Sequence, residues 1–162
     1  MNDGGDPERL VSIQLLGVPL GLQQRAAEHN DGLRREFQLL VEHGEAARES
    51  VPDRLVKVAA ELDRRFLAFT QTTRTELERA ASRGVDQIDV TLQLPAAAGP
   101  AAAEFGELLH EADEYCAAGR HLLTLAAPPD VVAFRKWVLG ELVRQIHGEA
   151  PVSWRQFSES SS

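Results

Sequence analysis

The chain has 162 residues, of which 43% are hydrophobic and 26% charged, with one cysteine and a formal net charge of −8. This length predicts one domain with enough core to fold alone. The acidic balance disfavours a nucleic-acid partner or an anionic membrane surface, because both need a basic face. Cys116 has no cysteine to pair with, which excludes an internal disulfide and a multi-cysteine zinc site. We therefore expect a cytoplasmic protein that neither enters nor binds a membrane.

Both ends of the chain have the composition of tails. Residues 1–9, "MNDGGDPER", are acidic and glycine-rich and lack the basic start and apolar stretch of a signal peptide. We expect them to be a disordered N-terminal tail. Residues 151–162, which end in "SESSS", are expected to be a C-terminal tail. One ordered domain is thus predicted over residues 10–150.

The ordered region opens with the alternation of a half-buried strand. Val11, Ile13 and Leu15 alternate with polar residues, which predicts a strand over about residues 10–16. The segment "IDVTLQLP" repeats this pattern and ends at Pro95, which predicts a second strand over residues 87–94. Two such strands without a third suggest a small antiparallel pair that needs helical cover. A dimer could supply further strands across a two-fold axis.

Between the two predicted strands, apolar residues recur at helical spacing. The first helix is expected to start near Pro19 and to end near His43, before Gly44. The second is expected from Ser50, which begins a sequence close to a capping box, to about Arg83. Residues 69–75, "FTQTTRT", are rich in β-branched threonine, which predicts a kink or break there.

Two more helices are predicted after the second strand. One follows Gly99-Pro100 and runs to about Gly119. The apolar connector "HLLTLAAPP" then leads to a helix that begins near Pro129 and ends at Gly148. The predicted fold is therefore mainly α, a four-helix bundle-like domain with a two-stranded antiparallel β-pair.

The stretch "EHND" places four polar residues in the middle of the first helix. His29 shares a helical face with Ala26 and Leu33, so it is expected at the core or its edge. A buried imidazole needs a hydrogen-bond partner. We interpret His29 first as a satisfied polar position that fixes helix register, with Glu28 and Asp31 in solvent. The alternative is a binding determinant at the rim of a pocket.

The motifs of known catalytic and metal sites are weak or missing. Glu107 and His110 have the Glu-x-x-His spacing of di-iron bundles, which need two such motifs, and the chain has one. Cys116 lies near a helix end among acids, so it is expected to be a core residue and not a nucleophile. The chain contains no Gly-x-Ser-x-Gly elbow, P-loop or Gly-x-Gly-x-x-Gly motif. We expect neither catalysis, nor a metal, nor a cofactor.

The C-terminal quarter gathers cationic and aromatic residues in an otherwise acidic chain. Arg135, Trp137, Arg144 and Trp154 are of the types that anchor protein interfaces. A plainer alternative is that Trp137 packs in the bundle and Trp154 folds back over it.

Three segments resemble a family of small actinobacterial helical proteins of uncharacterised activity. They are "VPLGLQQRAAEHNDGLRREFQLL", "VPDRL" and "PPDVVAFRKWVLGELVRQIHGEAPVSW", and the resemblance extends from about Val11 to Trp154. This chain has Asn30 where the family pattern has a second His, and Val138 where it has Tyr. Members look like accessory components of partner-switching systems, beside kinase-like anti-sigma factors, STAS-domain antagonists and PP2C-type phosphatases.

These expectations combine into a non-enzymatic regulatory or adaptor protein of bacterial signal transduction, with sigma-factor or stress-response control implied by the resemblance. The expected partner is an anti-sigma factor, a STAS-domain protein or a PP2C phosphatase, and a homodimer is a further expectation. The expected partner-binding residues are Glu28, His29, Arg35, Arg135, Trp137, Glu141, Arg144 and Trp154. The alternative is a small-molecule or metal-binding sensor or enzyme, with His29, Glu36 and His110 lining a cleft between helices.

Overall fold

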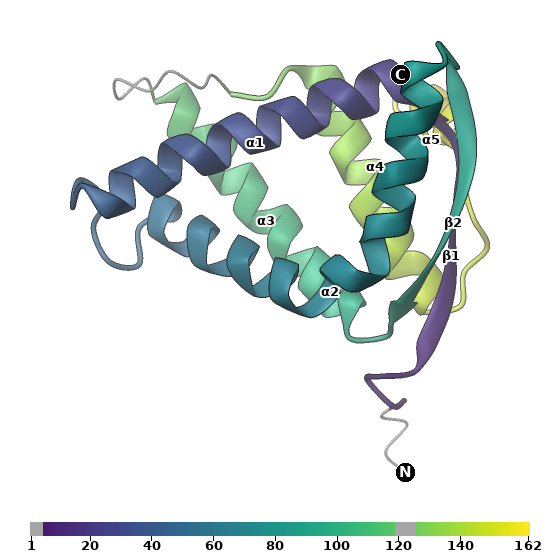
Figure 1. Cartoon of the computed structure of the whole chain (residues 1–162), viewed down its shortest axis with the longest axis horizontal. Helices are drawn as coiled ribbons and strands as arrows, with labels where there is room; N and C mark the ends of the chain where they lie inside the picture. The colour runs from purple at the N-terminus through teal and green to yellow at the C-terminus, as the bar shows by residue number, and fades with distance from the viewer. Residues whose placement is uncertain (1–4, 119–125) are drawn as a thin grey trace.

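The computed structural model describes residues 5–118 and 126–162. Its elements follow in the order β1 (Leu10–Pro19), α1 (Leu20–Glu42), α2 (Val51–Ser82), β2 (Gln87–Pro95), α3 (Ala98–Ala117), α4 (Pro129–Ile146) and α5 (Trp154–Ser160). The mainly α fold with a small antiparallel pair is confirmed (Figure 1). Most of the predicted apolar connector and residues 1–4 of the predicted N-terminal tail lie outside the described residues.

The two strands pair along their whole length. The register runs from Leu10 opposite Pro95 to Pro19 opposite Gln87, with an irregularity between Leu15 and Val18. Gly17 lies in this bulge with a positive φ of 71°, a conformation that glycine adopts without strain. The bulge lets β1 continue past Gly17, which the sequence had indicated as the end of the strand.

The chain before β1 is hydrogen-bonded to the chain that follows β2. Ala96 N–H donates to the carbonyl of Arg9 at 2.8 Å, and Ala97 N–H donates to that of Pro7 at 2.9 Å. Residues 7–9, the end of the predicted N-terminal tail, are thus bonded to the chain that follows β2.

One face of the sheet belongs to the core and the other faces solvent. Ile13, Leu15, Val90 and Leu94 are buried and pack with Trp137. Their neighbours along the strands are exposed, namely Ser12, Gln14, Asp89, Thr91 and Gln93. α4 packs against β1 and α2 packs against β2, so two helices supply the cover that a two-stranded sheet needs.

Helix α2 is unbroken from Val51 to Ser82, but its axis turns in the second half (Figure 1). The first part lies near α3, and the second part rises beside β2. Thr70 Oγ1 donates to the carbonyls of Phe66 and Leu67 at 3.4 and 3.3 Å, and Thr75 Oγ1 donates to that of Gln71 at 3.1 Å. Such hydroxyl-to-carbonyl bonds bend helices. The structure thus has the predicted kink and not a break.

A second core lies among the helices away from the sheet. It is formed by Leu33 and Phe37 of α1, Leu55 of α2, and Leu108, Leu109, Ala112 and Cys116 of α3. The two cores together hold four long helices against each other and against the sheet. Among the described residues, no helix has both the length and the apolar character needed to cross a membrane.

The fifth helix, α5, lies where a C-terminal tail was predicted. Ser153 caps it in a capping box with Gln156. The ring of Trp154 lies 5.7 Å from that of Trp137 and 5.8 Å from that of Phe134. Part of the predicted C-terminal tail is thus a helix, Trp154–Ser160. The ring contacts agree with the plainer interpretation of Trp154, that it folds back on the bundle.

Candidate functional site

The middle of α1 belongs to a buried polar cluster that joins three helices. His29 Nε2 lies 3.9 Å from Asp113 Oδ1 on α3, and Asp113 pairs with Arg135 on α4. Asp113 Oδ1 also accepts the N–H of Ala127 at 3.2 Å. The three side chains are only 8–13% exposed. We call His29, Asp113 and Arg135 the buried cluster.

The electrostatics of the buried cluster disfavour protonation of His29. Burial lowers the imidazole pKa below its usual 6.5, and Arg135 lowers it further, whereas the Asp113 carboxylate opposes the shift. Within the described residues, His29 Nε2 and Arg135 Nη1 have no hydrogen-bond partner. The cluster therefore holds α1, α3 and α4 in register around one ion pair. The place of His29 between the helices agrees with the first interpretation of "EHND". Its Nε2 atom, however, lacks the hydrogen-bond partner that this interpretation required.

The thiol of Cys116 lies next to this cluster on α3. Burial raises its pKa to about 11, and the charges of Asp113 and Glu36 add to the shift. A thiol with such a pKa stays protonated near neutral pH and reacts slowly. Its burial in the second core agrees with the predicted core role.

The Glu-x-x-His pair weighed in the sequence, Glu107 and His110, is exposed on α3. His110 and Glu114 are 64% and 70% exposed and lie 3.4 Å apart, one turn from each other on α3. No group of three or more His, Cys, Asp or Glu side chains in residues 5–118 and 126–162 is arranged to hold a metal ion.

Three of the predicted partner-binding residues are internal. Arg135, Trp137 and Glu141 are 8%, 1% and 3% exposed. Trp137 Nε1 donates to the carbonyl of Val152 at 2.9 Å, and Glu141 accepts the N–H of the same residue at 2.9 Å. Trp137 and Glu141 therefore bind the chain's own C-terminal segment, and Arg135 pairs with Asp113. Their burial does not fit the surface role that the sequence suggested.

The other predicted contacts are spread over distant elements. Arg144 pairs with Glu141 and with Glu149, and Trp154 packs on the aromatic core, so both belong to the same C-terminal assembly. Glu28 and Arg35 are exposed on α1. His29 is largely covered. The structure thus joins Arg144 and Trp154 to the residues that bind Val152, whereas Arg135 lies with His29 in the buried cluster. Glu28 and Arg35 belong to neither group.

Sequence reasoning missed two residues that connect these side chains to neighbouring elements. Asp113 is the shared partner of His29 and Arg135, and Gln145 bonds the backbone of Gln14 on β1. The available signal was a polar residue next to an apolar helical stripe: Asp113 follows Ala112, and Gln145 precedes Ile146.

A cleft of about 880 Å³ opens between α1, α2, α3 and α4. We call it the interior cleft. Its apolar lining includes Ala26, Phe66, Leu67, Leu77, Leu94, Phe105, Phe134, Val138 and Leu142. Its polar lining carries both charges, in Glu28, Asp31, Arg34, Asp63, Arg74 and Glu78. Neither His29 nor His110 lines it, so the predicted histidine-lined cleft does not correspond to this cavity.

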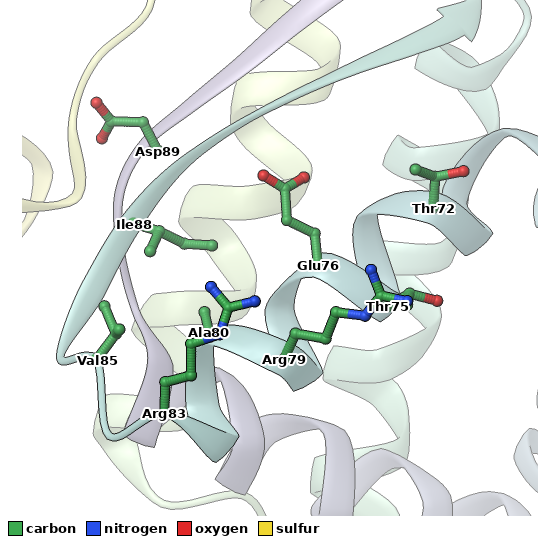
Figure 2. A pocket seen from close by; sticks show the side chains of 9 residues that line it. All are labelled: Thr72, Thr75, Glu76, Arg79, Ala80, Arg83, Val85, Ile88 and Asp89. Atoms are coloured by element: carbon green, nitrogen blue, oxygen red, sulfur yellow. The ribbon is translucent and has the colours of Figure 1, made fainter.

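A second hollow, of about 800 Å³, lies between the second half of α2 and the start of β2 (Figure 2). We call it the edge groove. Helix α2 contributes Thr72, Thr75, Glu76, Arg79 and Ala80, and its C-cap residue is Arg83. Val85, before β2, and Ile88 and Asp89, within β2, complete the lining. Ile88 points toward α2, whereas Asp89 points away from it (Figure 2). The Asp89 carboxylate accepts the Gly17 N–H at 2.7 Å.

Comparison of the chain with protein-family models, with curated proteins and with solved structures found no match.

Proposed function

We propose that the protein is a non-enzymatic adaptor that binds a helical segment of another protein in the interior cleft. The observation that carries the proposal is the make-up of this cleft, an apolar lining from four helices together with side chains of both charges. An amphipathic helix needs this combination, because its apolar face fills the floor while its flanks meet the charges.

The dimensions of the cleft also suit a helix. Its lining on α1 extends from Gln23 to Arg34, which spans roughly 16 Å at the rise of an α-helix. A docked helix of about three turns has this length. On α2 the lining continues from Ala59 through the kink to Ser82, so the bend shapes the wall.

The signalling role rests on the resemblance of three sequence segments to accessory proteins of partner-switching systems. The proposed partners are accordingly an anti-sigma factor, a STAS-domain protein or a PP2C phosphatase, in the cytoplasm. Among the residues first expected to contact a partner, Glu28 lines the interior cleft and keeps that proposed role. Arg35 is exposed nearby on α1 and could extend the contact.

Two exposed leucines provide a matched test. Leu67 lines the interior cleft and is 40% exposed, whereas Leu39 is 52% exposed on α1 and does not line it. A tagged parent protein, Leu67→Asp and Leu39→Asp would each be used for capture from an actinobacterial extract, with quantitative mass spectrometry of the bound proteins. We expect one signalling protein to be recovered by the parent and by Leu39→Asp but lost with Leu67→Asp. Equal recovery by all three would contradict docking in the cleft.

A small apolar ligand is the second candidate occupant. The volume of about 880 Å³ lies in the range of small-molecule sites, roughly 300–1,000 Å³. Organic extraction of the same captured samples, followed by mass spectrometry, separates the two functions. A lipophilic compound that is lost with Leu67→Asp, without a protein partner, would favour a sensor over an adaptor.

A further inference from the structure

The outer edges of β1 and β2 differ in their hydrogen bonding to the rest of the described chain. On β1, Gln14 N–H donates to Gln145 Oε1 and Gln14 C=O accepts from Gln145 Nε2, both at 2.8 Å. These backbone groups therefore point away from β2. In an antiparallel ladder, a residue whose N–H and C=O point outward faces a partner whose groups also point outward. Thr91, which lies opposite Gln14, is that partner.

The outward groups recur at every second residue of β2, at Asp89, Thr91 and Gln93. All three residues are exposed. No backbone or side-chain group in the described ranges, 5–118 and 126–162, bonds to their outward N–H and C=O. Between Gln87 and Leu94 the strand has no proline or lysine, the residues that commonly protect edges. Gln145 closes the β1 edge, whereas the β2 edge is open.

The edge groove lies at the beginning of this open edge (Figure 2). Its wall, the second half of α2 with its C-cap, carries Arg79 and Arg83. Neither forms an ion pair with any described residue. Glu76 is the one acid that α2 adds to this lining. Asp89 is already engaged by the Gly17 N–H. Val85, 37% exposed, and Ile88 supply apolar surface in the same hollow. Apolar surface and two guanidinium side chains thus line the same hollow as Asp89, the first residue of the open edge.

We propose that β2 and the edge groove bind an extended acidic segment of another polypeptide, which adds to the sheet as a third strand. Its backbone would pair with Asp89, Thr91 and Gln93, since strand addition works through main-chain hydrogen bonds. Apolar side chains on one face would cover Val85 and Ile88. Carboxylates near the end of the segment that lies beside the start of β2 would pair with Arg79 and Arg83.

A lone strand fits this groove better than a second copy of the chain. A third strand needs a helix over its apolar face, and α2 already forms that wall. A two-fold axis at Thr91 would bring a second α2 toward the same wall. The proposal is independent of the interior cleft, because the cleft is lined by a different set of α2 residues, including Thr70, Arg74, Leu77 and Glu78.

The test uses two capped nine-residue peptides of alternating valine and threonine, one ending in two glutamates and the other in two lysines. The readout is the ¹⁵N-resolved amide spectrum of the full chain during titration to about 1 mM peptide, a concentration that detects weak binding. We expect the glutamate peptide to shift and to protect from exchange the amides of Asp89, Thr91 and Gln93. The lysine peptide should bind at least about tenfold more weakly, because it loses two charge-assisted contacts.

Matched variants locate the contact. Thr91→Pro removes an outward N–H without touching a β1–β2 hydrogen bond, and Ser12→Pro does the same on the other edge. Binding should be lost with Thr91→Pro and kept with Ser12→Pro. Arg79→Glu/Arg83→Glu should abolish the preference for glutamate, whereas Arg35→Glu should not. Should Thr91→Pro fail to fold, the glutamate peptide N-methylated at alternate amides provides the same test, because methylation in the pairing phase should abolish binding.

Three outcomes would overturn the proposal. The first is the absence of amide shifts with the glutamate peptide at the highest concentration. The second is equal binding of the two peptides, which would exclude acidic recognition. The third is self-association of the parent protein that Thr91→Pro removes, which would make a second copy the occupant of the edge.

Discussion

Gln145 on α4 holds the backbone of Gln14 on β1 through both ends of its side-chain amide, with two bonds of 2.8 Å. Gln145 Nε2 also donates to Glu141 Oε2 at 2.9 Å, and the same oxygen accepts the N–H of Val152 at 2.9 Å. A single hydrogen-bonded chain therefore connects the sheet edge, α4 and the segment that leads into α5. It explains why a buried glutamine lies next to the apolar stripe of α4.

Gln145→Leu should destabilise the fold by about 2–4 kcal/mol, because it leaves the N–H and C=O of Gln14 unpaired beside an apolar side chain. The measurement is the free energy of unfolding in urea, with the transition followed by tryptophan fluorescence. Gln14→Ala is the control: it keeps the backbone groups and removes only an exposed side chain, so it should cost less than about 0.5 kcal/mol. Similar losses for the two variants would contradict the bracing role of Gln145.

Asp113→Leu should be among the most destabilising substitutions outside the apolar cores, at about 3–5 kcal/mol, because it leaves the charge of Arg135 buried without its partner. The double variant Asp113→Leu/Arg135→Met should recover much of this loss, since it removes both charges. A double-mutant cycle on unfolding free energies measures the coupling.

The pair Arg34–Asp63 is the control for that cycle. It joins α1 to α2 at 2.7 Å, but both side chains are 39% exposed. Its coupling should stay below about 1 kcal/mol, because water screens exposed pairs. If the two cycles gave equal coupling energies, burial would not be the cause of the strength of the Asp113–Arg135 pair.

How far the sequence predicts this fold depends on whether a pattern is local. The strands were predictable because alternation of apolar and polar residues is local, and the kink was predictable because the hydroxyls of Thr70 and Thr75 bond to their own helix. α5 was missed because it is a short segment that ends in serine and glutamate, while its order comes from Trp154 and Phe157 packing on a distant aromatic core. Polar composition does not report such tertiary contacts.

The pH dependence of stability should carry a contribution from His29. Its pKa is lowered in the folded state by burial, so below about pH 6.5 the unfolded chain takes up a proton that the folded chain does not. The contribution is therefore fully present above the unfolded pKa and is lost as the pH falls through the folded pKa. Unfolding free energies of the parent and of His29→Gln, measured from about pH 7.5 to about pH 5, should diverge on acidification, with the parent losing more.

His110→Gln is the companion variant for this measurement. His110 is exposed on α3, so its replacement leaves the buried cluster intact and the contribution of His29 should remain. If the unfolding free energies of the parent and His29→Gln fell in parallel over the whole pH range, His29 would have the same pKa in the folded and unfolded states.

The candidate sites were less predictable than the fold, for a physical reason. Trp137 and Arg135 have the residue types of interface anchors, and those types are equally suited to a core that closes on the chain's own C-terminus. Only burial separates the two roles. Trp137→Ala should therefore impair folding before it reports on any partner. The open edge of β2 was also invisible, because it depends on which strand edge the distant helices bond, and Gln145 bonds that of β1.

Cys116 should react slowly in the folded protein. Its thiol is 5% exposed, and burial with nearby acids raises its pKa to about 11, so little thiolate forms near neutral pH. Ellman's reagent at about pH 8 should label the native chain much more slowly than the chain in urea, where the pKa returns to about 8.5. Asp113→Leu provides an internal check: it removes a carboxylate that raises the thiol pKa and also loosens α3, so labelling should accelerate. Fast stoichiometric labelling of the native parent protein would place the thiol outside the second core and would contradict the packing of α1 against α3.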